Sequence, residues 1–132
     1  MKVVKAWEEK GTVIPEPYKR EIKVLFAPDK QQVKELTYLH AIFYPGSRSD
    51  YHVHDRPELI TVVTGRGIAL AGKIEIPIEP DMALWVEKGE EHQIINTGSE
   101  TMKLANVFIP AMTVAETIEP RLEAAKKTEK KV

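Results

Sequence analysis

Apolar and polar residues alternate through most of the chain in short runs, and turn-forming residues separate these runs. The run REIKVLF alternates and stops at APDK, and the run ELITVVT ends where GRG supplies two glycines. A period of two residues, interrupted by Gly, Pro, Asp and Ser, is typical of strands joined by turns. The pattern therefore predicts β-strands at 20–26, 34–44, 58–65, 67–72, 73–78, 82–89, 92–96 and 101–110.

The turns between these strands predict how the strands connect. Strands 67–72 and 73–78 are expected to form a hairpin around Gly72, and strands 92–96 and 101–110 a last hairpin around the turn TGSE. Turn signals recur at roughly ten-residue spacing, and no helix alternates with the strands. This rhythm favours an all-β fold, either a sandwich or a closed barrel.

The end of the chain differs from the rest in composition. The segment AETIEPRLEAAKKTEKKV, residues 115–132, is rich in charged residues and predicts either a short helix or a frayed tail. At 132 residues the chain is expected to form a single domain. The core of this domain is expected at residues 20–114, with residues 115–132 as a charged C-terminal tail.

Composition narrows the classes of partner. A formal net charge of -1 provides no electrostatic reason to bind nucleic acid or an anionic membrane, so we expect a small-molecule substrate or ligand. No apolar stretch reaches the ~20 residues of a membrane span, and MKVVKAWEEK lacks the apolar core of a secretory signal. We therefore expect a cytoplasmic protein. Because the chain has no cysteine, any metal site must use histidine and carboxylate ligands.

A cluster of such ligands lies in GSRSDYHVHDRPELITVVTG, residues 46–65. His52 and His54 project to the same side of an extended chain, and Glu58 can join them if the intervening DRP keeps the register. His92, at the start of another predicted strand, is the third of only four histidines in the chain. A lone H-x-H pair is also typical of two partly exposed strand histidines. The added carboxylate and third histidine favour a site.

Three imidazoles and one carboxylate, without sulfur, suit particular metals. Such a nitrogen and oxygen set binds Fe(II), Mn(II), Ni(II), Cu(II) or Zn(II) and does not suit calcium. We expect one divalent transition metal per chain, with part of an octahedral shell left to water, where a substrate or dioxygen can enter.

The same residues carry a family resemblance. The pattern G-x5-H-x-H-x3-E-x6-G is matched in full by Gly46, His52, His54, Glu58 and Gly65. The pattern G-x5-P-x-G-x2-H-x3-N is matched at Gly89, His92 and Asn96, whereas Asp81 replaces its first glycine and Glu87 its proline. The chain thus resembles a small single-domain member of the cupin superfamily. Asp81 tolerates the turn conformations of a glycine, but Glu87 removes a rigid element and adds a charge.

The resemblance implies a fold and a site. It implies a double-stranded β-helix, or jelly roll, of six to eight strands, with His52, His54, Glu58 and His92 on a divalent metal inside the barrel. It also implies a homodimer. It does not imply a reaction, because similar cupins include dioxygenases, decarboxylases, sugar isomerases, lyases, cyclases and non-catalytic binding domains. Both an enzyme, of dioxygenase, isomerase or lyase type, and a non-catalytic ligand-binding or metal-stabilised domain therefore remain open.

Neighbouring strands supply further candidates. In strand 34–44, Tyr38 and His40 share one face and Leu39 and Ala41 the other. If the first face looks inward, His40 is a candidate catalytic proton donor or acceptor beside the metal; otherwise it is a packed or outward strand residue. Asn96 and Trp85 are expected in structural roles, Asn96 in holding strand geometry and Trp85 in the core or an interface.

The strand ELITVVTG also bears on the homodimer. It is apolar at both parities, with Ile60 and Val62 on one face and Leu59 and Val63 on the other. Only one face of a barrel strand looks inside, so the other face needs cover. A second copy of the chain can supply that cover, and so can the N-terminal segment VVKAWEEKGTVIP.

Overall fold

The computed structural model describes residues 1–130. Over this part the chain forms a single 3-10 turn, nine strands and one helix. In chain order these are η1 (Ala6–Glu8), β1 (Thr12–Ile14), β2 (Arg20–Phe26), β3 (Thr37–Phe43), β4 (Glu58–Thr64), β5 (Gly67–Ala71), β6 (Ile74–Ile78), β7 (Ala83–Val86), β8 (His92–Ile95), β9 (Met102–Phe108) and α1 (Val114–Lys130).

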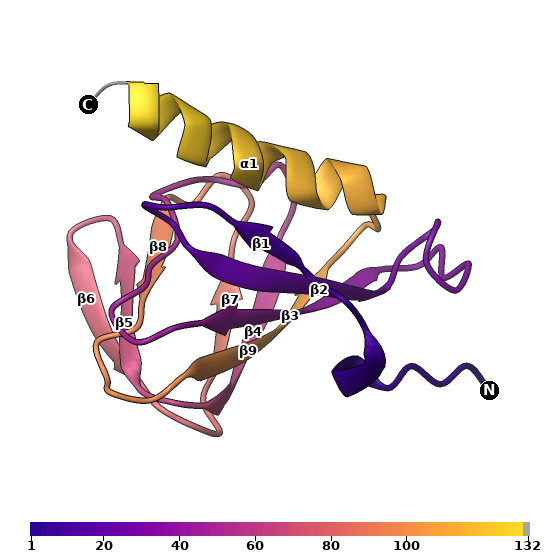
Figure 1. The fold of residues 1–132 in the computed structure, drawn as a ribbon, viewed down its shortest axis with the longest axis horizontal. Coiled ribbons are helices and arrows are strands. Elements are labelled where there is room, and N and C mark those ends of the chain that lie inside the picture. The colour runs from indigo at the N-terminus through magenta and orange to yellow at the C-terminus, as the bar shows by residue number, and fades with distance from the viewer. Residues whose placement is uncertain (131–132) are drawn as a thin grey trace.

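The strands form two antiparallel sheets (Figure 1). The larger sheet has six strands in the order β1-β2-β3-β9-β4-β7, and the smaller has three in the order β6-β5-β8. The all-β jelly-roll prediction, with a short C-terminal helix, is confirmed. Within the described residues, backbone hydrogen bonds group the strands into these two sheets and form no single closed ring.

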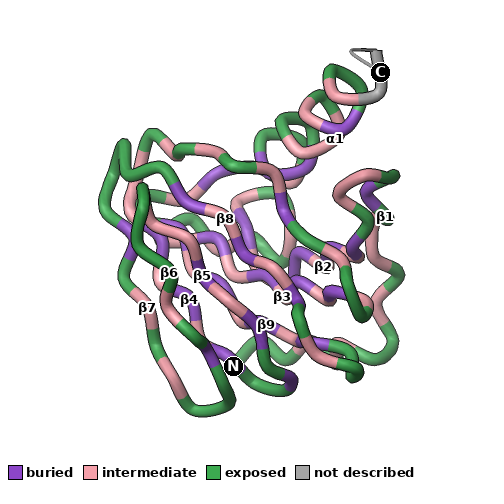
Figure 2. The backbone as a smooth tube through the Cα atoms, turned by 90° about the vertical axis from the view of Figure 1, so that its left-hand side faces the viewer, coloured by how far each residue is buried: buried purple, intermediate pink, exposed green. Residues whose placement is uncertain are grey.

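The core lies on the inward faces of the strands. In β3 and β9 every second residue is buried, so that purple and pink alternate along these strands in Figure 2. The alternation follows from the pleat, which sends successive side chains to opposite faces. Leu39, Leu104 and Phe108 are at most 1% exposed, and Ile60 joins them from β4. Burial of this apolar surface stabilises the fold.

One predicted connection is confirmed and another is wrong. β5 and β6 form the expected hairpin, with Ala71 opposite Ile74. The expected hairpin of β8 and β9 is absent, because β8 pairs with β5 while β9 pairs with β3 and β4. The turn between them instead crosses from one sheet to the other. Asn96 holds this crossing, since its Nδ2 donates to the carbonyls of Phe43 at 3.0 Å and Glu100 at 2.8 Å.

The charged tail forms the helix α1. The sequence begins it with a capping box, in which the Glu116 N–H donates to Thr113 Oγ1 at 3.1 Å and the Thr113 N–H to Glu116 Oε1 at 3.3 Å. Thr117, Ile118 and Ala125 form its buried face. The helix therefore packs along one side of the strands, above β1 in Figure 1. Within residues 1–130, no helix is long and apolar enough to cross a membrane.

The N-terminal segment lies beside β2. Its strand β1 pairs with β2, and the Ala6 carbonyl accepts a hydrogen bond from Lys23 Nζ at 2.9 Å. The outward face of β4 and β7 stays open to solvent, with Val63 42% and Trp85 53% exposed. The N-terminal segment, which was predicted as an alternative cover for this face, therefore lies elsewhere on the molecule.

Candidate metal centre

Backbone pairing places the first two histidines beside β8. The His52 N–H donates to the His92 carbonyl at 3.0 Å, and the His92 N–H donates back to the His52 carbonyl at 2.9 Å. The Gly89 N–H donates to the His54 carbonyl at 3.0 Å, so the pairing continues into the turn before β8. The loop preceding β4 thus runs antiparallel to β8 without being part of a named strand.

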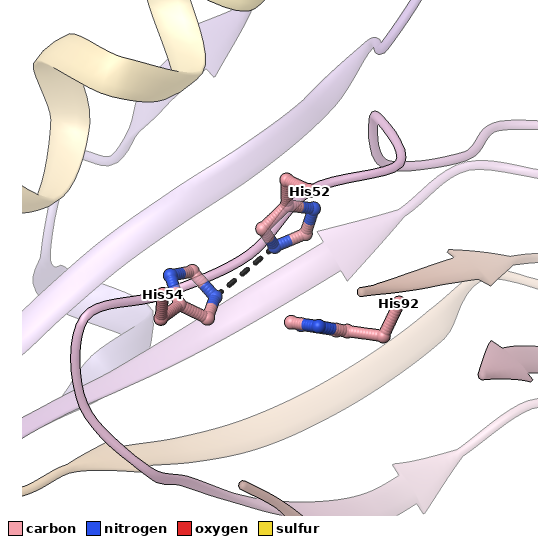
Figure 3. A group of neighbouring side chains, drawn as sticks. All are labelled: His52, His54 and His92. Atoms are coloured by element: carbon pink, nitrogen blue, oxygen red, sulfur yellow. Dashed lines mark hydrogen bonds between the residues drawn. The ribbon is translucent and has the colours of Figure 1, made fainter. Parts of the chain in front are cut away.

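The three predicted histidine ligands converge at one point (Figure 3), and the predicted carboxylate ligand lies against them. One ring nitrogen from each of the three histidines lies within 4.8 Å of the others, and His52 Nε2 is 3.0 Å from His54 Nε2. Glu58, the first residue of β4, is 3% exposed. Its Oε1 lies 3.3 Å from the Nε2 atoms of both His54 and His92. The structure therefore brings the whole predicted ligand set together.

Hydrogen bonds to backbone carbonyls orient two of the rings. His52 Nδ1 lies 2.7 Å from the Asp50 carbonyl and His92 Nδ1 lies 2.9 Å from the Glu90 carbonyl. A carbonyl only accepts, so each Nδ1 carries a proton, and in its neutral form each ring presents an Nε2 lone pair to the centre of the cluster. His92 Nε2 is buried and has no hydrogen-bond partner among the described residues. A cation would satisfy these converging lone pairs, as in other histidine metal sites.

The charge states also suit a metal. Burial, together with the nearby His92 and His54, lowers the pKa of His52 to about 4, so this imidazole is neutral at neutral pH. Burial alone would raise the pKa of Glu58, but contacts with His54, His92 and Asn106 lower it well below its usual range. A neutral imidazole and an ionised carboxylate are the forms that coordinate divalent metals.

Asn106 supports the carboxylate, and sequence reasoning missed it. Its Nδ2 donates to Glu58 Oε2 at 2.7 Å from the inward face of β9. The signal was present, because Asn106 occupies an apolar parity between Leu104 and Phe108. Both of these neighbours are buried.

Two cavities meet at the site. A cavity of about 560 Å³ lies between the His52–His54 loop and α1, and both histidines line it. A smaller cavity of about 30 Å³ lies deeper, against Glu58 and His92. The ligand cluster is therefore reached from outside under α1. Sequence reasoning also missed two arginines that line the smaller cavity, Arg20 and Arg121.

The expected catalytic role of His40 requires correction. The buried face of β3 is the one that carries Leu39 and Ala41, and His40 lies on the other face, where it pairs in register with Lys23 of β2. Its Nε2 is 3.1 Å from the Tyr38 hydroxyl. The proposed role depended on this face looking into the barrel, and it does not.

The two departures from the cupin pattern leave the geometry intact. Asp81 adopts φ 73°, the left-handed conformation in which glycine is usual. Glu87 is exposed, and its backbone N–H, which a proline would lack, donates to Glu90 Oε1 at 3.2 Å. Gly89 follows at φ 79° and completes the turn into β8.

A family model described as "Cupin domain" matches residues 39–109, more than half of the chain. The chain belongs to the cupin family. No curated protein matches this cupin.

Solved structures share the fold of this cupin. A predicted oxalate decarboxylase from Thermotoga maritima superposes with a TM-score of 0.75 at 23% identity, covering 83% of this chain and 99% of the other. A conserved protein with a double-stranded β-helix domain from Klebsiella pneumoniae gives 0.68 at 18% identity, covering 84% and 91%. A Cupin 2 conserved barrel domain protein from Salinispora arenicola gives 0.65 at 16% identity, covering 90% and 92%. At these identities the likeness concerns the fold.

Proposed function

We propose that this cupin is a metal-dependent enzyme acting on a small oxygenated organic molecule, in a reaction of the dioxygenase, isomerase or lyase type. One divalent transition metal, Fe, Mn, Ni, Cu or Zn, would be held by His52, His54, Glu58 and His92. The observation that carries the proposal is the cavity of about 560 Å³ whose wall includes His52 and His54. A metal that only stabilises the fold does not require a cavity through which a small molecule can reach it.

Each residue of the site would have a separate role around a bound metal. A bound metal would supply Lewis acidity or a binding place for dioxygen. Glu58 and the imidazoles in their neutral form would bind the ion, while Asn106 holds the Glu58 carboxylate in place. The carbonyl of Asp50 fixes the orientation of the His52 ring. The cavity admits the organic molecule, and α1 limits the access of bulk water from one side.

Open coordination separates an enzyme from a closed structural site. Four protein ligands complete a tetrahedral zinc site, whereas an octahedral ion keeps positions for water or substrate. His52, His54 and Glu58 come from one continuous segment and His92 from β8, so the ligand set would leave part of the coordination shell of an octahedral ion to other ligands. The larger cavity adjoins this ligand set.

The small inner cavity favours a second candidate. At about 30 Å³ it has room for about one water molecule, as expected for a non-catalytic cupin whose metal stabilises the barrel.

The predicted oxalate decarboxylase among the structural neighbours is consistent with including a lyase among the candidate reactions. The cytoplasmic location and the homodimer stay predictions from the sequence.

Metal loading followed by a small exogenous ligand tests the proposal. Elemental analysis of the purified protein should give one transition metal per chain, and His54→Ala should abolish stoichiometric binding. Addition of nitric oxide to the Fe(II) protein, or of azide to the Co(II) protein, should change the spectrum. A bound metal with no spectral change in either case would decide for the non-catalytic candidate.

A further inference from the structure

The helix α1 brings a positive charge to the metal centre. Arg121 lines both the larger cavity and the inner one. Its guanidinium carbon lies 5.8 Å from the centre of the Phe108 ring, and that ring lies 4.9 Å from the ring of His54. Arg121 therefore stands beside the candidate ligands, although it comes from a segment that the sequence predicts as a charged tail.

Most of the hydrogen-bonding capacity of Arg121 is unused within the protein. Its Nη1 donates to the Thr117 carbonyl at 2.5 Å. Among the side chains that the structure describes, those of residues 1–128, no carboxylate oxygen lies within 4.0 Å of its guanidinium nitrogens. A guanidinium has five N–H donors in a planar fork, which suits a carboxylate. A guanidinium with free N–H donors in a cavity wall can bind an anion.

A second arginine lies deeper. Arg20 is 2% exposed, its Nη1 donates to the Tyr18 carbonyl at 2.8 Å, and its Nη2 lies 3.6 Å from Asp50 Oδ1. Burial and the charge of Arg121 lower the pKa of Arg20 to about 9, so Arg20 stays protonated at neutral pH. The inner cavity thus has two cationic side chains in its wall.

Four charged side chains next to the histidine cluster have a net charge of zero when no metal is bound. Asp50 and Glu58 carry two negative charges, and Arg20 and Arg121 carry two positive charges. A divalent ion on the histidine cluster adds two further positive charges in a partly buried place. Uncompensated buried charge is costly, so a ligand with negative charge is favoured there.

We propose that the substrate of this cupin is a small carboxylate anion, held between the metal and the guanidinium of Arg121, with Arg20 adding positive charge behind it. The proposal rests on the proposed function and names its substrate class. The outer cavity is also lined by one further cation, Arg56, and by four carboxylates that are exposed to solvent: Asp55, Glu116, Glu119 and Glu123. Water and salt screen exposed charges far more than buried ones, so the interior decides the sign of the ligand.

Calorimetric titration of the Zn(II)-loaded protein tests the proposal without any assay of turnover. The probes are oxalate and its neutral counterpart oxamide. Oxalate is expected to bind, and oxamide to bind more weakly. Arg121→Gln should weaken oxalate binding about 10- to 100-fold, which corresponds to the loss of charge-assisted hydrogen bonds. Arg121→Lys should fall between the two. Lys126→Gln removes a positive charge from an exposed position of the same helix, outside both cavity walls, and should bind oxalate like the wild type.

The outcomes separate this proposal from the proposed function. If wild-type protein binds one zinc but takes up oxamide as tightly as oxalate, the anion site is overturned without the use of any variant. Equal oxalate affinity in Arg121→Gln and wild type, at equal zinc content, also overturns it. Failure of the wild-type chain to bind zinc or any other transition metal would instead overturn the proposed function.

Discussion

At the residue scale, the candidate centre depends on neighbouring groups that hold the ligand side chains in place. Asp50 and Glu90 fix the His52 and His92 rings through backbone carbonyls, so each Nε2 points to the same place. Asn106 does the same for Glu58 through a hydrogen bond of 2.7 Å. Supports of this kind decide whether four potential ligands form one binding site.

Removal of the Asn106 amide should weaken metal binding without removing a ligand. We expect Asn106→Ala to lower Zn(II) affinity about 10- to 100-fold, because the Glu58 carboxylate loses the hydrogen bond that orients it. Competition with a coloured chelator measures the affinity. Lys103→Ala, on the outward face of β9, is the matched control and should bind zinc like the wild type. Equal affinity in Asn106→Ala would contradict this role of Asn106.

The titration of His40 follows from its partly buried place on β3. Burial, with smaller contributions from Lys103 and Lys23, lowers its pKa below 6.5. The unfolded chain then takes up the proton more readily, so the stability that neutral His40 contributes is present above 6.5 and is lost as the pH falls through the folded pKa. Imidazole NMR signals should give a midpoint below 6.5.

The same spectra distinguish His40 from the ligands. Addition of Zn(II) should shift or broaden the signals of His52, His54 and His92 and leave that of His40 nearly unchanged. A zinc-induced change of similar size at His40 would show that the histidine belongs to the centre after all.

At the element scale, turns and crossings decide which strand reaches which sheet. β4 ends where the chain turns toward the smaller sheet, and Gly65 makes this turn at φ 83°. A Cβ at this position would lie 2.6 Å from the Cα of Met102 in β9. The backbone of β9 therefore packs directly against the turn at Gly65 and leaves no room there for a side chain.

Two glycine substitutions separate backbone strain from this close approach. Gly65→Ala and Gly72→Ala both place a side chain at positive φ, which costs about 1–2 kcal/mol. At Gly72 an added Cβ meets nothing within 4 Å, whereas at Gly65 it meets β9. Gly65→Ala should therefore lower the free energy of unfolding more than Gly72→Ala in urea titrations. Equal losses would mean that β9 shifts to accommodate the added methyl group, so that the close approach adds nothing to the cost of the positive φ.

At the scale of the whole molecule, one apolar surface lies outside the core. In register across the larger sheet lie Tyr38, Val107, Leu59 and Trp85, on the faces of β3, β9, β4 and β7 that point away from the core. Trp85, at the edge strand of this row, is 53% exposed. We propose that a second copy of the chain packs on this surface.

Light scattering tests the homodimer. The wild type should show twice the 15.0 kDa mass of the chain, and Trp85→Lys should shift the protein toward the monomer because a charge is buried poorly in an apolar contact. Trp7→Lys is the control, since Trp7 is 78% exposed on the N-terminal segment. A wild-type mass of 15.0 kDa over a wide concentration range would contradict the homodimer.

The sequence by itself determined the ligand set and the strands β2 to β9, but not the short strand β1. Alternation of apolar and polar residues is a local property of each strand, and the parity of His52 and His54 follows from it. Together with the spacing to Glu58 and His92, this was enough to predict an all-β fold and the residues that converge in it, while the jelly roll was implied by the resemblance to cupins. Asn106 was also within reach, as a lone polar residue at an apolar parity.

Only the tertiary structure decided which elements meet. A turn such as TGSE serves a hairpin or a crossing between sheets equally well, so the partners of β8 and β9 depended on contacts far away in the chain. The inward face of β3, and with it the place of His40, was set by packing against both neighbouring strands. The position of Arg121 followed from the docking of α1, because the charge pattern of an isolated tail contains no information about the surface on which its helix packs.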